Sequence, residues 1–298
     1  MIGCWWLIGI PTNNKQLTPN KNSMNITIIG CGYVGLRVAQ YWQQECNFII
    51  TATTTTPERV AELETIAQRA IVLQGNDFDK LKSVLKNQDV VLLSVGAKGP
   101  NTYEESYLQT ARNLVSALKQ APSVQQLIYT SSCSVYGEQN GALVDEETQV
   151  APKTPGSEIL YATEQELLAG SSDHLRVCIL RLGGIYGPGR ELVKIYSRIA
   201  GTTRPGSGEE PANWIHVDDI VAAVEFARRH RLQGIYNLVD NDELTTREVS
   251  ERVCEIHNLP KVTWDSSLSS KRPYNAKISN QKIKEAGYEF IHPQMIFS

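Results

Sequence analysis

The chain has 298 residues, of which 41% are hydrophobic and 20% charged, and its formal net charge is −3. This length and composition are typical of a globular protein with one large domain or two interleaved ones. The slight negative charge gives no electrostatic footprint for nucleic acid or an anionic membrane, so we expect neither as a partner.

Residues 1–23 differ from the rest of the chain. The apolar residues 4–10 are far too few to span a bilayer, and no positively charged segment precedes them. Polar, irregular sequence follows up to Met24, which opens the first predicted strand. We therefore expect residues 1–23 to be a poorly ordered extension, with translation naturally starting at Met24.

Six cysteines are scattered along the chain, and none belongs to a CxxC pair or to a Cys/His cluster with metal-ligand spacing. This distribution is typical of a protein in a reducing compartment. We therefore expect a cytoplasmic location and no metal site.

Three spaced glycines interrupt the first hydrophobic run. The β-branched residues 24–29 predict a buried strand, and residues 36–42 predict the helix that follows. The first glycine permits a tight turn, the second lets the backbone approach a pyrophosphate, and the third lets the helix pack close to the strand. The free N–H groups of the helix then face the phosphates. This turn contributes five residues to the predicted dinucleotide site: Gly30, Gly32, Tyr33, Val34 and Gly35.

The second predicted strand, residues 47–52, is followed by four threonines. An NAD-selective site usually carries Asp or Glu about 20 residues after the glycines, where it binds the ribose 2′-hydroxyl. Thr53 and Thr54 occupy that place here, Thr56 is the predicted N-cap of the next helix, and Arg59 follows. Hydroxyls, a helix N-terminus and an arginine favour a 2′-phosphate, which a carboxylate repels. The sequence therefore predicts NADP as cofactor, with NAD as the alternative.

Strands and helices continue to alternate along the chain, which predicts right-handed βαβ units and an α/β, doubly wound parallel sheet of the Rossmann type. The further predicted strands cover residues 70–73, 89–96, 126–130, 175–181 and 234–239. We expect residues 24–186, with a returning segment at about 213–240, to form the dinucleotide-binding domain. Residues 187–212 and 241–298 are expected to form a smaller, substrate-side region.

Two later helix starts carry capping signals. Asp218 and Asp219 precede an apolar stripe and predict an N-cap there. Thr245 with Glu248 forms a capping box, and Leu244 with Val249 adds a hydrophobic staple. The second start is fixed by two independent signals.

Four segments in order resemble the extended short-chain dehydrogenases, the NAD-dependent epimerase/dehydratase group. Besides the glycine turn, these are Tyr-Thr-Ser-Ser-Cys-Ser-Val-Tyr-Gly at 129–137, Arg-Leu-Gly-Gly-Ile-Tyr-Gly-Pro-Gly-Arg at 181–190, and Trp-Ile-His-Val-Asp-Asp at 214–219. The resemblance extends from Met24 to about Tyr288. It implies a Rossmann fold and a nicotinamide cofactor, and it adds six residues to the predicted cofactor site: Val95, Gly96, Thr130, Ser131, Leu182 and Gly183.

The resemblance also implies catalytic positions. In that family, a Ser or Thr three residues before the Val of the second segment binds the reacting oxygen, and Ser132 holds that place. The general acid/base is the Tyr of a Tyr-x-x-x-Lys pair on the next helix. One alignment takes Tyr161 and Gln165 as a degraded pair, whereas the other places Gly156 and Leu160 at the two positions and leaves both groups missing. The second preserves more of the flanking pattern, and it turns Tyr161 about 140° around the helix.

Ser132 and Tyr161 are therefore the candidate catalytic residues. Further polar residues near the family-like segments are interpreted as structural: Tyr136, Tyr186, Arg190 and His216. Lys271 and Arg272 form either an anion clamp or a surface pair.

The sequence as a whole predicts an oxidoreductase that uses NADP and acts on an unidentified small molecule. A non-catalytic, dinucleotide-sensing regulatory protein is the alternative, because the acid/base pair is missing. A nucleotide-sugar epimerase or dehydratase is the third reading. The sequence does not fix an oligomeric state.

Overall fold

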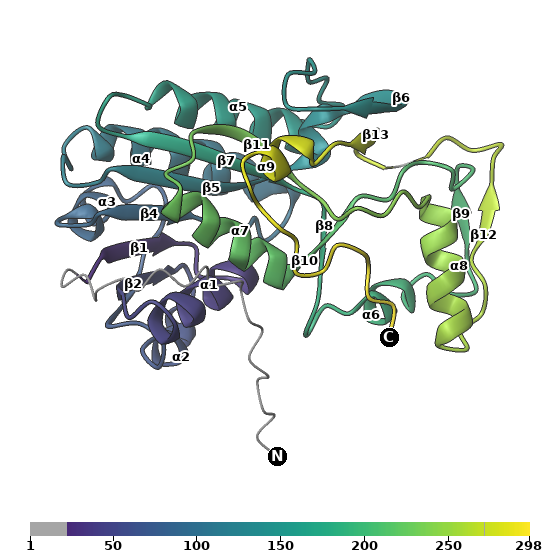
Figure 1. Cartoon of the computed structure of the whole chain (residues 1–298), viewed down its shortest axis with the longest axis horizontal. Helices are drawn as coiled ribbons and strands as arrows, with labels where there is room; N and C mark the ends of the chain where they lie inside the picture. The colour runs from purple at the N-terminus through teal and green to yellow at the C-terminus, as the bar shows by residue number, and fades with distance from the viewer. Residues whose placement is uncertain (1–22, 271) are drawn as a thin grey trace.

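The β-branched runs form the strands of a seven-stranded sheet, and every adjacent pair in it is parallel (Figure 1). The computed structural model describes residues 23–270 and 272–298, so the expected N-terminal extension lies, apart from Ser23, outside the described residues. The strand order is β11-β7-β5-β4-β1-β2-β3. The strands are β1 (Asn25–Ile29), β2 (Ile49–Thr54), β3 (Arg69–Val72), β4 (Val90–Leu93), β5 (Gln126–Ser132), β7 (Arg176–Leu182) and β11 (Gly234–Leu238). The predicted doubly wound parallel sheet is confirmed.

Helices cover both faces of the sheet (Figure 1). One face carries α1 (Tyr33–Gln44), α2 (Val60–Leu63), α7 (Val217–Arg229) and α9 (Gln281–Glu285). The opposite face carries α3 (Phe78–Leu85), α4 (Thr110–Leu118) and α5 (Pro155–Ala169). Strand β1 contributes side chains to the hydrophobic cores on both faces of the sheet. Ile26 and Ile28 pack with the first set of helices, whereas Ile29 packs with the second. Within the described residues, no helix has both the length and the apolar character needed to cross a membrane.

Short elements extend from the carboxyl end of the sheet. Three two-stranded parallel ladders pair β10 with β8, β12 with β9, and β13 with β6. These elements are β6 (Glu138–Val144), β8 (Gly184–Tyr186), β9 (Thr203–Pro205), β10 (Trp214–His216), β12 (Thr263–Asp265), β13 (Asn275–Ile278), α6 (Leu192–Tyr196) and α8 (Thr246–Ile256). Helices α6 and α8 gather with β9 and β12 away from the main sheet (Figure 1).

A buried ion pair joins α5 to the sheet. The Arg181 side chain on β7 donates to both carboxylate oxygens of Glu164 on α5, with the shortest contact at 2.7 Å, and the two side chains are 2% and 0% exposed. The hydroxyl of Ser131 at the end of β5 donates to the same carboxylate at 2.6 Å. Burial opposes the charge on Arg181, but the hydrogen bonds and charge of Glu164 outweigh it and raise the pKa of the guanidinium. Together these bonds fix how α5 is rotated on the sheet.

The structure corrects one predicted helix start and bears out the position of another. Helix α7 is capped by His216, whose Nδ1 accepts from the Asp218 N–H at 3.2 Å, so the predicted Asp218–Asp219 cap is wrong. Both aspartates lie inside the first turn, where they complement the helix dipole. Thr56 is the N-cap of a short 3₁₀ turn, η1 (Pro57–Arg59), that begins with Pro57, as predicted, but the Thr56 hydroxyl makes no capping hydrogen bond. The chain turns into α2 there without needing a capping hydroxyl.

The predicted capping box at α8 is confirmed. Thr245 accepts from the Glu248 N–H at 3.2 Å, and the Glu248 carboxylate accepts from the Thr245 N–H at 2.7 Å. Leu244 packs with Val249 in the same apolar cluster, as a hydrophobic staple requires.

We predict that Glu164→Gln lowers the free energy of unfolding by about 3–5 kcal/mol, because it leaves the Arg181 guanidinium buried without a counter-charge. Urea denaturation of the full chain measures this change. The matched control is Glu166→Gln on the same helix, which removes only a 3.9 Å contact between exposed side chains with Arg112. That variant is expected to stay within about 1 kcal/mol of the wild type. Equal losses in the two variants would contradict the role of the buried pair.

Candidate cofactor site

The glycine turn between β1 and α1 is shaped by close backbone packing. Gly30 has φ +87°, and a Cβ on it would stand 2.6 Å from the Ser94 carbonyl oxygen. A Cβ on Gly35 would stand 2.6 Å from the Gly30 oxygen. Gly32, the N-cap of α1, has nothing within 4 Å of its Cβ direction. The outer glycines therefore let the backbone close up, while the middle one faces open space where a ligand can approach.

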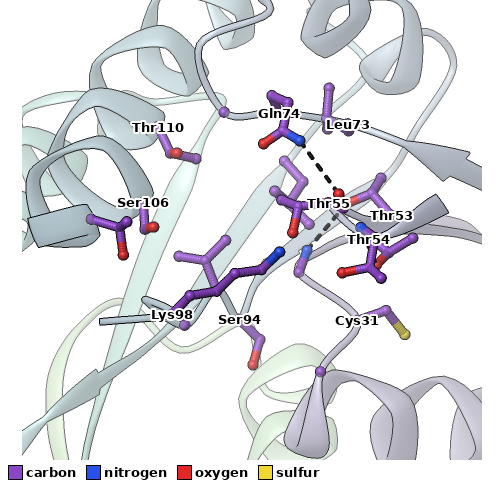
Figure 2. Close-up of a pocket in the computed structure, with 18 of the residues that line it drawn as sticks. Cys31, Thr53, Thr54, Thr55, Leu73, Gln74, Ser94, Lys98, Ser106 and Thr110 are labelled. Carbon is purple, nitrogen blue, oxygen red and sulfur yellow. Dashed lines mark hydrogen bonds between the residues drawn. The ribbon is translucent and has the colours of Figure 1, made fainter. Parts of the chain in front are cut away.

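A cavity of about 340 Å³ opens over this turn, at the carboxyl ends of β1, β2, β3 and β4. Figure 2 shows side chains from these strand ends pointing into it. Seven of the residues predicted for the cofactor line it: Gly30, Gly32, Thr53, Thr54, Arg59, Val95 and Gly96. The carboxyl edge of a parallel sheet is where ligands bind in doubly wound folds.

The threonine segment holds the glycine turn in place. The Gly30 N–H donates to Thr53 Oγ1 at 3.1 Å, and the Cys31 N–H donates to the Thr53 carbonyl oxygen at 2.8 Å. Arg59 donates to the Cys31 carbonyl oxygen at 2.7 Å and pairs with Glu62 at 2.9 Å. Arg59 is thus partly committed to the turn and to a carboxylate, although its side chain remains 31% exposed.

Lys98 is a cation that sequence reasoning missed. It lies in the loop after β4, it lines the cavity, and its side chain extends across the opening (Figure 2). It forms no salt bridge to any residue that the structure describes. The signal was its place just beyond the predicted strand at 89–96, on the edge where the glycine turn also lies.

The remaining predicted cofactor residues do not line the cavity. Five of them lie deeper or further along the same edge of the sheet: Val34, Gly35, Thr130, Leu182 and Gly183. The guanidinium carbon of Arg37 lies 3.9 Å from the centroid of the Tyr33 ring, and the Tyr33 hydroxyl donates to the Pro188 carbonyl oxygen. Ser131 is occupied by Glu164. These positions support the turn and the strand ends rather than form the cavity wall.

The two candidate catalytic residues lie outside the cavity wall as well. Ser132 ends β5, and its Oγ accepts from the Ser134 N–H at 3.1 Å, which caps the 3₁₀ turn η4 (Cys133–Tyr136). Tyr161 is half-buried and packs against the apolar cluster that contains Tyr136 and Leu160. Leu160 is 6% exposed. The catalytic role of Ser132 and Tyr161 stays a prediction.

Two of the polar residues near the family-like segments, and Arg272 in the C-terminal part, are held by internal contacts. Tyr136 donates to Asn237 at 2.8 Å and lies against the Arg181 guanidinium. The Tyr186 hydroxyl accepts from the Ile296 N–H at 3.1 Å. Arg272 donates to the Pro211 carbonyl oxygen and to the Thr246 hydroxyl, whereas Lys271 lies outside the described residues. These contacts agree with structural roles.

His216 is buried beside a carboxylate and a second histidine. His216, Asp219 and His292 have ligand atoms within 4.8 Å of one another, a grouping of metal-ligating type that the cysteine pattern did not anticipate. Both oxygens of Asp219 already accept hydrogen bonds, at 2.7 Å from the Ile291 N–H and 3.0 Å from the His292 N–H. Burial lowers the pKa of His216 to about 4. We interpret the grouping as a set of contacts that holds the C-terminal segment at Ile291 and His292 against the start of α7.

A second cavity, of about 330 Å³, lies between the end of β11 and the start of α9. Asp240 is one of its lining residues, is 4% exposed, and has no hydrogen-bond partner for its Oδ2 among the described residues. Burial, with the nearby charges of Asp242 and Asp219, raises the pKa of Asp240 from 3.8 to about 8, against the opposing hydrogen bond from the Asp242 N–H. Asp240 is therefore mainly protonated in the folded chain at neutral pH.

Comparison with known proteins agrees with this architecture. The model of the NAD dependent epimerase/dehydratase family matches residues 26–238. Protein YeeZ of Escherichia coli (strain K12) is 29% identical over 281 residues, which cover 90% of this chain and 96% of YeeZ. The structure of MoeE5 in complex with UDP-glucose and NAD gives a TM-score of 0.73 at 21% identity, over 88% of this chain and 91% of that one. UDP-glucuronic acid 4-epimerase from Bacillus cereus in complex with NAD gives 0.70 at 17% identity, over 87% and 90%.

We predict that Asp240→Asn stabilises the chain increasingly as pH rises. Between the pKa of 3.8 and the raised value of about 8, the folded chain holds a proton that the unfolded chain has lost. Stability from this group is therefore present below the lower value and is lost as pH rises through the higher one. The gain in unfolding free energy from the substitution should grow by more than about 2 kcal/mol between pH 5 and pH 8.5 in urea denaturation. A gain that does not change with pH would contradict a buried, protonated Asp240.

Proposed function

Because the chain belongs to the NAD-dependent epimerase/dehydratase family, we propose that it is an oxidoreductase that prefers NADP and acts on a small molecule. The proposed preference for NADP rests on one observation. The threonine end of β2 and two cations, Arg59 and Lys98, line the same cavity over the glycine turn. The chemistry of hydride transfer is supplied by the nicotinamide when it is bound, and the protein supplies orientation and a proton source.

The preference for NADP follows from the charges around the cavity. A 2′-phosphate carries negative charge that hydroxyls and cations stabilise, whereas an NAD-selective carboxylate repels it. Thr53, Thr54 and Thr55 line the cavity where that carboxylate usually lies. Glu105 also contributes to the lining, and its carboxylate accepts from the Asn76 amide at 3.1 Å. Arg59 is already paired with Glu62, which neutralises part of its attraction for a phosphate. We therefore expect Lys98 to make the stronger contact with an incoming phosphate.

The substrate is proposed to bind beside the cofactor, between the sheet and the smaller region of residues 187–212 and 241–298. Ser132 at the end of β5 is proposed to orient the reacting oxygen. We place the reaction in the cytoplasm, in keeping with the five cysteines of the described residues, all of which are free thiols.

A non-catalytic dinucleotide sensor is the second candidate. Leu160 supports it, because a buried apolar side chain replaces the lysine that the family resemblance calls for. A nucleotide-sugar epimerase or dehydratase is the third candidate, and the nucleotide sugar in the MoeE5 complex supports it. The missing pair weighs against both epimerase and dehydratase chemistry.

We predict that wild-type protein binds NADPH more tightly than NADH in titration calorimetry, and that Thr55→Asp removes this preference. Thr55 is exposed and lines the cavity, so the new carboxylate meets the 2′-phosphate without disturbing the core. NADPH affinity should fall at least tenfold more than NADH affinity, a difference of about 1.4 kcal/mol. Thr65→Asp is the control, because Thr65 is exposed outside the cavity. A wild-type preference for NADH would overturn the proposal for NADP.

A separate test concerns Lys98. Lys98→Ala is expected to weaken NADPH binding by about tenfold, because a charge-assisted bond to phosphate is worth about 1.5–3 kcal/mol. Lys119→Ala, which removes an exposed lysine beyond the end of α4, should leave the affinity unchanged. Calorimetry at two salt concentrations should also show a weaker salt dependence for Lys98→Ala than for the wild type. Equal affinity and salt dependence in the two variants would remove Lys98 from the site.

A further inference from the structure

The space next to Gly156 is filled by another residue. Gly156 stands at the first turn of α5, where the family resemblance calls for the catalytic tyrosine. A Cβ on Gly156 would lie 3.0 Å from Cε1 and 3.3 Å from Cδ1 of the Tyr103 ring. The ring of Tyr103 therefore packs directly on the helix at that point, and even a Cβ at position 156 would require the ring to shift slightly.

Tyr103 comes from the segment that follows β4. It lies between the 3₁₀ turn η2 (Pro100–Thr102) and the π-helical turn η3 (Glu104–Gln109). Its neighbours Thr102 and Ser106 line the cofactor cavity. One side of this segment thus faces the cofactor cavity, while Tyr103 reaches α5.

The hydroxyl groups of the two tyrosines in this segment are placed differently. The rings of Tyr103 and Tyr107 pack with their centroids 5.2 Å apart. The Tyr107 hydroxyl accepts from the Ala97 N–H at 3.4 Å, so it is directed to the loop after β4. The Tyr103 hydroxyl makes no hydrogen bond to any residue that the structure describes, and the side chain is half-buried. The Tyr103 hydroxyl is therefore able to donate a hydrogen bond to a ligand.

Tyr103 is linked to the predicted substrate-orienting serine only through a shared apolar cluster. It packs against the apolar cluster formed by Cys133, Val135 and Leu160. Cys133 directly follows Ser132. The Tyr103 ring thus lies against the α5 position and in the same cluster as Cys133, in a segment whose neighbouring residues line the cofactor cavity.

We propose that Tyr103 is the proton donor of the reaction, in place of the tyrosine missing from α5. This inference rests on the proposed oxidoreductase function. In reduction of a carbonyl, hydride leaves C4 of NADPH for the carbonyl carbon. The Tyr103 O–H bond breaks as its proton passes to the carbonyl oxygen, giving the alcohol, NADP⁺ and a tyrosinate that regains a proton from water. Ser132 orients the same oxygen.

The test uses the purified full chain with NADPH and a panel of small aldehydes and ketones, followed through loss of NADPH absorbance. Tyr103→Phe is expected to lower kcat by about 100-fold or more, the usual contribution of a general acid, with NADPH affinity within twofold of wild type. Tyr107→Phe keeps the ring in the same aromatic pair and should retain kcat within about threefold. Wild-type kcat in Tyr103→Phe, or loss of activity in Tyr161→Phe instead, would overturn the proposal.

A crystal structure of the wild-type chain with NADPH gives a second readout that does not depend on turnover or on the folding of a variant. The proposal expects the Tyr103 hydroxyl on the side of nicotinamide C4, within direct or one-water hydrogen-bond reach of a carbonyl oxygen placed there. A hydroxyl beyond that reach overturns the role of Tyr103 while leaving the cofactor function intact. Absence of NADPH binding would overturn the oxidoreductase function itself, and the role of Tyr103 with it.

Discussion

The buried pair of Glu164 and Arg181 is the constraint on which the candidate site depends. Two charges that are almost wholly removed from water are tolerable only when they are paired and hydrogen-bonded, and here Ser131 adds a third donor to the carboxylate, while Nη1 of Arg181 has no hydrogen-bond partner among the described residues. Because β7 is fixed in the sheet, the pair permits one rotation of α5. That rotation directs Leu160, one helical turn before Glu164, toward the interior. It also determines which side chains pack against Gly156.

The rotation of α5 explains why the family-like helix departs from the family without losing its position. The Glu164 carboxylate holds the helix on the sheet, whereas the favoured alignment places Gly156 and Leu160 at the positions where the resemblance implies a tyrosine and a lysine. A glycine at position 156 leaves room that the ring of Tyr103 fills. The inferred role of Tyr103 therefore amounts to an exchange between elements: where the resemblance places a tyrosine on α5, the segment after β4 places one against Gly156.

The sequence was sufficient where the determining contacts are local. The β-branched runs, the glycine turn and the capping box of Thr245 with Glu248 each involve residues a few positions apart, and all three were predicted. Contacts between distant segments were not predictable in this way. Lys98 enters the cavity because β4 lies beside β1, and His292 meets His216 because the C-terminal segment returns to α7. His216 also caps α7 in place of the predicted aspartates, since its backbone is extended just before the helix whereas Asp218 and Asp219 are already helical.

The same exchange alters the electrostatics of the cofactor site. In the family resemblance, a lysine on α5 lies near the nicotinamide ribose and stabilises a tyrosinate. Here that position is the buried Leu160, and the additional cation, Lys98, lies by the glycine turn and the threonine end of β2. In the proposed binding mode, the positive charge of the site therefore lies toward the phosphates of the dinucleotide. In the proposed function, the cations Arg59 and Lys98 bind the phosphates of the dinucleotide, and Tyr103 supplies the proton for carbonyl reduction.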